Sequence, residues 1–422
     1  MSAEKKKTPL FDWHKANGGN MVEFGDYVMP LWYAGTKAEH LGVITNAGLF
    51  DTSHMAAVMV NGSDTFDLIQ LCFTRDLNAC VGKKNEPIKP GRCVYGAFLD
   101  EKGHSVDDGI VYKIKDDQFM VVVNAGMGGT IAQHLEDRKG SRDAVCTDMT
   151  DKLGKIDIQG PMSVKTMQKV IKNPEEVFKK LFYFSFKGHF DGNAETATQV
   201  QMLDGTPFVL SRSGYTGEVG FEIFIELEHT VKIWEAIIEA GQEFGLVPCG
   251  LASRDSLRTG AVLPLSHQDI GEWTYINHPW PFALPLSEAG DDFTKTFIGS
   301  EAIKNDDKAE YTVTFVGNDL RKVDSHDAVV LDLEGNEIGT VLTCATDMAI
   351  GRHEGTIYSI ASADKPEGMK IKGLCAGFIK VKSNLEPGTV VVLKDNKRKL
   401  KVVIEKNVRP ARTARKPLKK LL

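Results

Sequence analysis

The sequence lacks the patterns that mark several common kinds of site. Its seven cysteines are an odd number, include no C-x-x-C pair, and form no short cluster with histidine at the spacing of zinc ligands. No serine–histidine or cysteine–histidine arrangement of a nucleophilic active site stands out either. These absences favour a reduced cytoplasmic protein without disulfides or a bound metal.

Long apolar runs are also missing. No stretch approaches the roughly 20 apolar residues that span a bilayer. The charged first residues, MSAEKKK, lead into no apolar signal segment. We therefore expect a protein that is neither exported nor inserted into a membrane. The net charge of −6, with both signs mixed along most of the chain, argues against a nucleic-acid partner.

Basic residues gather only near the end of the chain, between Lys397 and Lys420. We expect the last ten residues to be solvated or frayed, as charged termini usually are. A functional alternative is that Arg409 or Arg412 returns to a binding site and meets an anion there.

At 422 residues the chain is longer than one hydrophobic core usually organises, so several domains are expected. Alternating apolar residues predict strands at 56–60, 93–99, 109–114 and 119–123, and helical spacing predicts helices at 63–72, 161–171 and 229–244. From about residue 311 strands dominate. This order predicts an α+β body over residues 1–290 and an all-β barrel or sandwich with a basic tail over 291–422.

A glycine-rich turn leads into an apolar strand at 211–224, SRSGYTGEVGFEIF. Such a turn can bring backbone close to a flat ligand, with Tyr215 stacking on it and Glu222 accepting hydrogen bonds. A hairpin with exposed glutamates would have the same spacing. Further motifs accompany the turn in a fixed order: Asp51-Thr-Ser-His-Met55, Asp107-Asp108, Tyr112, Asn124-Ala125 and Gly250-Leu-Ala-Ser-Arg-Asp255.

Together these motifs resemble the aminomethyltransferase family, which comprises the tetrahydrofolate-binding T-proteins of glycine cleavage and their demethylase relatives. The resemblance covers nearly the whole chain. It implies a T-protein-like folate-binding body of two intertwined α+β subdomains, followed by the β domain. It also implies that Asp108 is the catalytic carboxylate, beside the reactive edge of the folate. The residues implied to bind folate are Met55, Tyr95, Tyr112, Asn124, Tyr183, Tyr215, Glu222 and Arg254.

Each of these residues also has a purely structural interpretation. Adjacent strand residues face opposite sides, so Asp107 and Asp108 are not expected to form a two-carboxylate pair. One carboxylate can enter a pocket while the other meets solvent or a backbone donor. Asp255 can hold Arg254 in position, and His54 is more often structural than catalytic.

The sequence departs from the family pattern after Arg254. Gly260 replaces a glutamate, and Ser266-His-Gln-Asp269 stands where the family has Tyr-Gly-His/Gln-Asp/Glu. The segment 275–282, YINHPWPF, is also unusual. In it His278 and Trp280, together with Phe282, can form an aromatic wall for a small methylated donor, or can simply pack in the core.

The resemblance thus implies a transferase that moves a one-carbon unit to tetrahydrofolate. In the T-protein form, an aminomethyl group on a lipoyl carrier protein gives ammonia and 5,10-methylene-tetrahydrofolate. The alternative is a demethylase that takes a methyl group from a small O-, S- or N-methyl compound and gives 5-methyl-tetrahydrofolate. A different class is a non-catalytic folate-binding factor; the Lys-Gly-Cys-Tyr-x-Gly-Gln-Glu motif of such relatives is absent.

Overall fold

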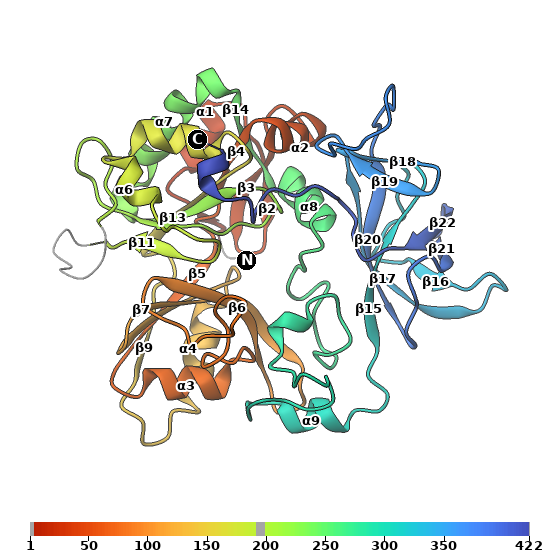
Figure 1. The fold of residues 1–422 in the computed structure, drawn as a ribbon, viewed down its shortest axis with the longest axis horizontal. Coiled ribbons are helices and arrows are strands. Elements are labelled where there is room, and N and C mark those ends of the chain that lie inside the picture. Colours follow the sequence, from red (N-terminus) through yellow and green to blue (C-terminus); the bar gives the residue numbers. More distant parts are fainter. Residues whose placement is uncertain (1–3, 191–198, 422) are drawn as a thin grey trace.

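The computed structural model describes residues 4–190 and 199–421. Two lobes that each combine a sheet with helices lie one above the other at the left of Figure 1, and a strand-rich lobe lies at the right. Helix α8 (Leu251–Gly260) lies at the centre, between the lobes. Within the described ranges, no helix combines the length and apolar character that crossing a membrane requires.

The upper lobe holds a six-stranded and a three-stranded sheet. The larger sheet has the spatial order β11 (Phe186–Gly188), β12 (Val209–Ser211), β13 (Gly220–Glu226), β10 (Leu153–Gln159), β4 (Ala47–Asp51) and β14 (Leu246–Cys249). The smaller sheet has the order β1 (Lys6–Lys7), β3 (Tyr27–Trp32) and β2 (Asn20–Phe24). The helical segments are α1 (Phe11–Ala16), α2 (Thr36–Thr45), α5 (Ser163–Val170), α6 (Pro174–Phe178), η1 (Leu227–His229), α7 (Thr230–Gly241) and η2 (Gln242–Phe244). Trp234 of α7 is buried in one core with Ile156 and Phe221 of the larger sheet.

The lower lobe is built on a five-stranded sheet. Its order is β6 (Arg92–Leu99), β7 (Ser105–Lys115), β8 (Gln118–Val123), β5 (Ala56–Asn61) and β9 (Val145–Asp148), accompanied by α3 (Thr65–Cys72) and α4 (Gly128–Glu136). The strands predicted from alternation at 56–60, 93–99, 109–114 and 119–123 are therefore confirmed, although β7 begins four residues earlier than predicted, at Ser105. The helices predicted at 63–72, 161–171 and 229–244 are also confirmed, the last as α7 continued by η2, with small differences at their ends.

The right-hand lobe is a closed barrel, which decides between the two predicted all-β forms. Its order is β15 (Tyr311–Val316), β20 (Leu374–Val381), β17 (Glu337–Asp347), β16 (Val329–Leu331), β21 (Val390–Lys394) and β22 (Lys399–Ile404). A separate hairpin is formed by β18 (Ile350–His353) and β19 (Thr356–Ser359). Barrel closure leaves no long sheet edge unpaired.

The segment between α8 and the barrel is fastened to the lower lobe. It includes η3 (Pro281–Ala283) and α9 (Ser300–Asn305). The hydroxyl of Thr74 donates to the carbonyl of Ala283 at 2.7 Å, and the backbone N–H of Tyr275 donates to the carbonyl of Gly103 at 2.8 Å. These bonds place the unusual part of the sequence beside β6 and β7.

The basic tail packs against the upper lobe, so residues 413–421 are not frayed, although the side chains of Arg415, Lys416, Lys419 and Lys420 are exposed, as expected of a solvated tail. Figure 1 shows the chain after β22 running back from the barrel past α8, and the tail ends in η4 (Leu418–Lys420). Leu418 is buried in the core of the upper lobe, and the backbone N–H of Val219 donates to the hydroxyl of Thr413 at 2.9 Å. The free energy gained by burying Leu418 and by pairing the polar groups of the tail exceeds the cost of ordering a segment rich in lysine.

Arg409 returns to the body, where its partners are anionic side chains of the chain itself; that Arg409 or Arg412 meets an anion at a binding site stays a prediction. Arg409 is 1% exposed, and one of its terminal nitrogens lies 2.6 Å from Oδ2 of Asp347, at the end of β17. Its Nε lies 3.5 Å from Oε1 of Glu218. The guanidinium therefore joins the barrel to the turn before β13.

Candidate active site

Asp107 and Asp108 are brought together by Asn124. The amide Nδ2 of Asn124 donates to Oδ1 of Asp107 at 2.8 Å and to Oδ1 of Asp108 at 2.7 Å. The expectation that the two carboxylates point apart is therefore wrong. The pairing of β7 with β6 shifts register beside Asp107, and Asn124 follows the end of β8, where one amide reaches both side chains. Asp107 also accepts a bond from the backbone N–H of Asn124 at 2.9 Å, which matches the predicted backbone donor.

Asp108 has an unusual proton affinity for a carboxyl group. Burial and the negative charge of Asp107 raise the pKa of Asp108 to about 6, against the opposing hydrogen bonds from Tyr95 and Asn124. The hydroxyl of Tyr95 donates to Oδ2 of Asp108 at 2.7 Å. A carboxyl group that titrates near neutral pH can hold or release a proton during a reaction.

Aromatic residues extend from Tyr95 toward the unusual segment. The ring of Phe282, 49% exposed, lies 5.9 Å from that of Tyr95. Trp280 is 2% exposed, and its Nε1 donates to the carbonyl of Val262 at 2.7 Å. His278 stacks on Trp280 with ring centroids 5.1 Å apart. Trp280 is thus packed inside, whereas Phe282 is exposed beside Tyr95; contact of His278 or Trp280 with a donor stays a prediction.

A chain of buried charges links α8 to the six-stranded sheet. A terminal nitrogen of Arg254 lies 2.9 Å from Oδ2 of Asp157, and Nζ of Lys155 lies 2.6 Å from both Oδ1 of Asp157 and Oε1 of Glu222. Burial opposes ionisation of Asp157, but the two cations outweigh it and hold its pKa below the usual value. All four charges are compensated within the chain.

The predicted pairing of Arg254 with Asp255 is wrong. Asp255 accepts a bond from Nε of Arg258 at 2.9 Å instead. Neighbouring residues of a helix point about 100° apart, whereas residues three positions apart share a face. Arg254 is left free to reach Asp157, which lies 97 positions earlier in the sequence.

Glu222 keeps one acceptor unused. Its Oε2 is buried and has no hydrogen-bond partner among the described residues, while Oε1 is held by Lys155. A buried unpaired carboxylate oxygen is costly, and an N–H donor is the kind of group that would satisfy it.

The other predicted folate residues lie around this charge chain. The guanidinium of Arg254 lies 4.9 Å from the ring centre of Tyr215, whose hydroxyl donates to the carbonyl of Pro264. Sδ of Met55 lies 3.9 Å from Arg254. The described contacts of the remaining two tyrosines differ. Tyr112 is buried edge-on against Phe186 and Phe224. The guanidinium of Arg415 lies over the ring of Tyr183, 5.5 Å from its centroid.

His54 has the structural environment that the sequence favoured. It is 5% exposed and packs edge-on against Phe24 and Tyr27. Burial lowers its pKa to about 4, so it is neutral near pH 7.

Sequence reasoning missed several polar residues of the site. Lys155 and Asp157 lie in an apolar strand, Leu153–Gln159, where charged residues need partners, and that pattern could have identified them. Ser266 donates to Oδ1 of Asp107 at 2.8 Å, and Nε2 of His267 lies 3.6 Å from the same oxygen. These two residues were noted as departures from the family pattern, but nothing local in the sequence places them on Asp107.

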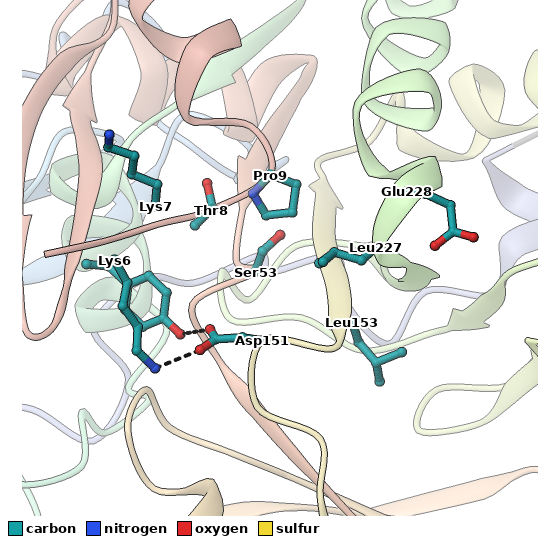
Figure 2. Close-up of a pocket in the computed structure, with 10 residues that line it drawn as sticks. Lys6, Lys7, Thr8, Pro9, Ser53, Asp151, Leu153, Leu227 and Glu228 are labelled. Atoms are coloured by element: carbon teal, nitrogen blue, oxygen red, sulfur yellow. Dashed lines mark hydrogen bonds and ion pairs between the residues drawn. The ribbon is translucent and has the colours of Figure 1, made fainter.

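An open pocket of about 650 Å³ lies apart from these residues, at the N-terminal strand (Figure 2). Lys6 lies 2.7 Å from Asp151 at its side, and the hydroxyl of Tyr27 donates to the same carboxylate. The residues that line this pocket include Thr8, Ser53 and Glu228, and none of the predicted site residues. Its size therefore does not identify it as the reaction site.

Comparison with known proteins agrees with this architecture. Residues 10–275 match the family model described as the GCVT N-terminal domain. The aminomethyltransferase of Natranaerobius thermophilus is 33% identical over 305 residues, which cover 71% of this chain and 75% of the relative. That of Bacillus mycoides is 35% identical over 304 residues, which cover 71% and 74% of the two chains.

The fold has a close counterpart among solved structures. The glycine cleavage system aminomethyltransferase T of Bartonella henselae superposes with a TM-score of 0.73 at 24% identity, and the match covers 95% of this chain and 96% of that one. At this identity the similarity concerns the fold alone. The family model and the sequence relatives establish more: this chain belongs to the GCVT aminomethyltransferase family.

Proposed function

We propose that the protein is a tetrahydrofolate-dependent aminomethyltransferase of the T-protein type, which forms 5,10-methylene-tetrahydrofolate from an aminomethyl group carried on a lipoyl protein. The observation that carries this proposal is the buried Asp108, which is bonded to Tyr95 and Asn124 and whose pKa is raised to about 6. The relatives named aminomethyltransferase support the same reaction class.

The residues present fit a folate. Its pterin is a flat ring system with N–H donors on one edge, and Oε2 of Glu222 is a buried acceptor without a partner in the described part of the chain. Arg254 contacts both Tyr215 and Met55 close by, and the three side chains offer a cationic, an aromatic and a soft apolar surface. We assign Glu222 and this group to folate binding.

Tetrahydrofolate, when bound, supplies the nitrogen nucleophile that accepts the one-carbon unit. The protein then needs to position the reactants and stabilise charge, which agrees with the lack of a nucleophile pattern in the sequence. We assign Asp108 to the reacting edge of the folate, where its carboxylate stabilises positive charge on the one-carbon unit and accepts a proton during the transfer. Asn124 and Tyr95 fix its two oxygens.

A second candidate is a demethylase that uses a small methylated donor. The exposed ring of Phe282 beside Tyr95, close to the carboxylates, favours it, because aromatic rings and carboxylates together attract sulfonium or ammonium compounds. The departures at 266–269 lie on the same side of the site, next to Asp107.

Mass spectrometry of the folate product distinguishes the two candidates. The protein is incubated with tetrahydrofolate and either an aminomethylated lipoyl carrier or a panel of small methylated compounds. Methylene-tetrahydrofolate from the carrier supports the main proposal. Methyl-tetrahydrofolate from a small compound supports the demethylase and identifies its donor. Tight folate binding without either product would overturn both in favour of a non-catalytic binder.

A further inference from the structure

His267 has a backbone conformation that histidine rarely adopts. Its φ is 61°, in the left-handed region that favours glycine. The family pattern has glycine at this position. Histidine therefore adds a side chain here, and the cost of this change is a strained backbone. Strained conformations cluster at functional sites, where the surroundings enforce them.

The neighbours of His267 hold it in this conformation. On one side the hydroxyl of Ser266 donates to Oδ1 of Asp107 at 2.8 Å. On the other side Nε2 of Gln268 donates to the hydroxyl of Thr343 on β17 at 2.8 Å, and that hydroxyl donates to Oδ1 of Asp269 at 2.6 Å. The loop is thus fixed to the five-stranded sheet and to the barrel, with His267 between the two attachments.

The side chain connects the buried carboxylates with solvent. Nε2 of His267 lies 3.6 Å from Oδ1 of Asp107, and the imidazole is 52% exposed whereas the carboxylate of Asp107 is 0% exposed. Contacts of this kind are often long before substrate binds. This contact with Asp107 raises the pKa of His267, with burial opposing it and the charges of Asp107 and Asp108 adding to it.

The charged groups around His267 favour its cationic form. From β7 the carboxylates of Asp107 and Asp108 act on it. On its own loop, Asp269 is already paired with Arg258. Asn124, which bridges the carboxylates, and Thr343, which anchors the loop to the barrel, are neutral.

We propose that His267 is a positioning residue whose imidazolium balances the Asp107–Asp108 pair and thereby sets the pH range in which Asp108 is ionised. This inference rests on the proposed function only in taking Asp108 as the carboxylate used in transfer. The coupling is reciprocal: if the carboxylates stabilise the imidazolium, the imidazolium stabilises the ionised carboxylates by the same amount. His267 is thus an addition to the site of this chain that a glycine cannot provide.

The coupling is measured first without any reaction. The Cε1–H resonance of His267, assigned by comparison with His267→Asn, is followed by NMR across pH 5–9 in the unmodified protein and in Asp107→Asn. Because half-exposed charges are partly screened, removal of the Asp107 charge is expected to lower the titration midpoint by about half a unit or more. An unchanged midpoint overturns the proposal, and this result does not depend on which one-carbon donor the protein uses.

The second measurement is the pH profile of transfer in His267→Asn and His267→Gly, both of which tolerate left-handed backbone. The acidic limb is expected to move up by about half a pH unit, so the rate at pH 5 falls about threefold relative to the unmodified protein while the rates converge above pH 8. His326→Asn, at an exposed histidine of the barrel, is the matched control and keeps the original profile. A purely structural His267 would give variants of altered thermal stability and an unmoved acidic limb, which contradicts the proposal.

Discussion

Asp107 and Asp108 accept hydrogen bonds from the same amide nitrogen, Nδ2 of Asn124, at 2.8 and 2.7 Å. The shared donor holds two like charges close together in a buried place. Such a pair retains a proton more readily than either carboxylate alone. The raised pKa of Asp108 follows from burial and from this neighbour, and it underlies the account of the site.

The transfer rate should depend on the ionisation of Asp108. Its pKa is raised to about 6, and the proposed role requires the carboxylate form. The rate should therefore rise with pH through about 6 and level off above pH 7. A pH series of kcat under saturating tetrahydrofolate and donor checks this. A rate that is flat between pH 5 and 7, in a protein that stays folded over that range, would show that Asp108 does not titrate in the reaction.

Replacement of Glu222 by glutamine should mainly weaken folate binding. The change removes the charge and one acceptor from the position where Oε2 is unpaired, so the dissociation constant for tetrahydrofolate should rise about 10- to 100-fold. Turnover at saturating folate should change much less. Calorimetry measures the affinity, with Glu226→Gln, at the end of the same strand, as the control. Equal affinity in Glu222→Gln and the unmodified protein would place the pterin elsewhere.

Arg409→Met should destabilise the fold. The substitution leaves buried Asp347 with only the hydrogen bonds to His40 and to the backbone N–H of Ala349 among the described residues, and removes the bonds to the turn at Thr216. Breaking a buried ion pair typically costs about 3–5 kcal/mol of unfolding free energy. Arg321→Met removes an ion pair at an arginine that is 69% exposed, and should cost about 1 kcal/mol or less. Denaturant unfolding compares the two; similar small losses would mean that the tail is not part of the stable fold.

Local patterns in the sequence were sufficient to predict most strands and the first helix of the lower lobe. The strand Ala56–Asn61 and the helix Thr65–Cys72 follow directly from their apolar periodicity and capping residues. The closed barrel was predicted only as one of two all-β forms, because closure depends on the pairing of β15 with β22 across the sequence. The proposed boundary at residue 290 stays a prediction.

The geometry of the site depended on contacts that are distant in sequence. Asp157 meets Arg254 across 97 positions, and Ser266 meets Asp107 across 159. Apolar periodicity describes residues that are close in sequence, so it cannot predict such pairs. The positions of Leu418 and Arg409 were missed or left open for the same reason, since the charge of the tail is visible in the sequence and its buried partners are not.

Asp108→Asn offers a clean variant for the central claim. Asparagine has nearly the same shape, and its amide can still accept from Asn124 and bond to Tyr95. Because burial and the charge of Asp107 disfavour the ionised form, removing the charge should increase the unfolding free energy at pH 7.5 and leave it nearly unchanged at pH 4. Lost activity in this variant cannot then be attributed to unfolding.

The most direct measurement is the single-turnover rate of one-carbon transfer to tetrahydrofolate in Asp108→Asn, together with the folate dissociation constant of the same preparation. The account predicts that the single-turnover rate falls by at least about 100-fold, whereas the folate dissociation constant stays within about threefold of that of the unmodified protein. A rate that is unchanged, or a rate and an affinity that fall together, would contradict the assignment of Asp108 to the reacting edge.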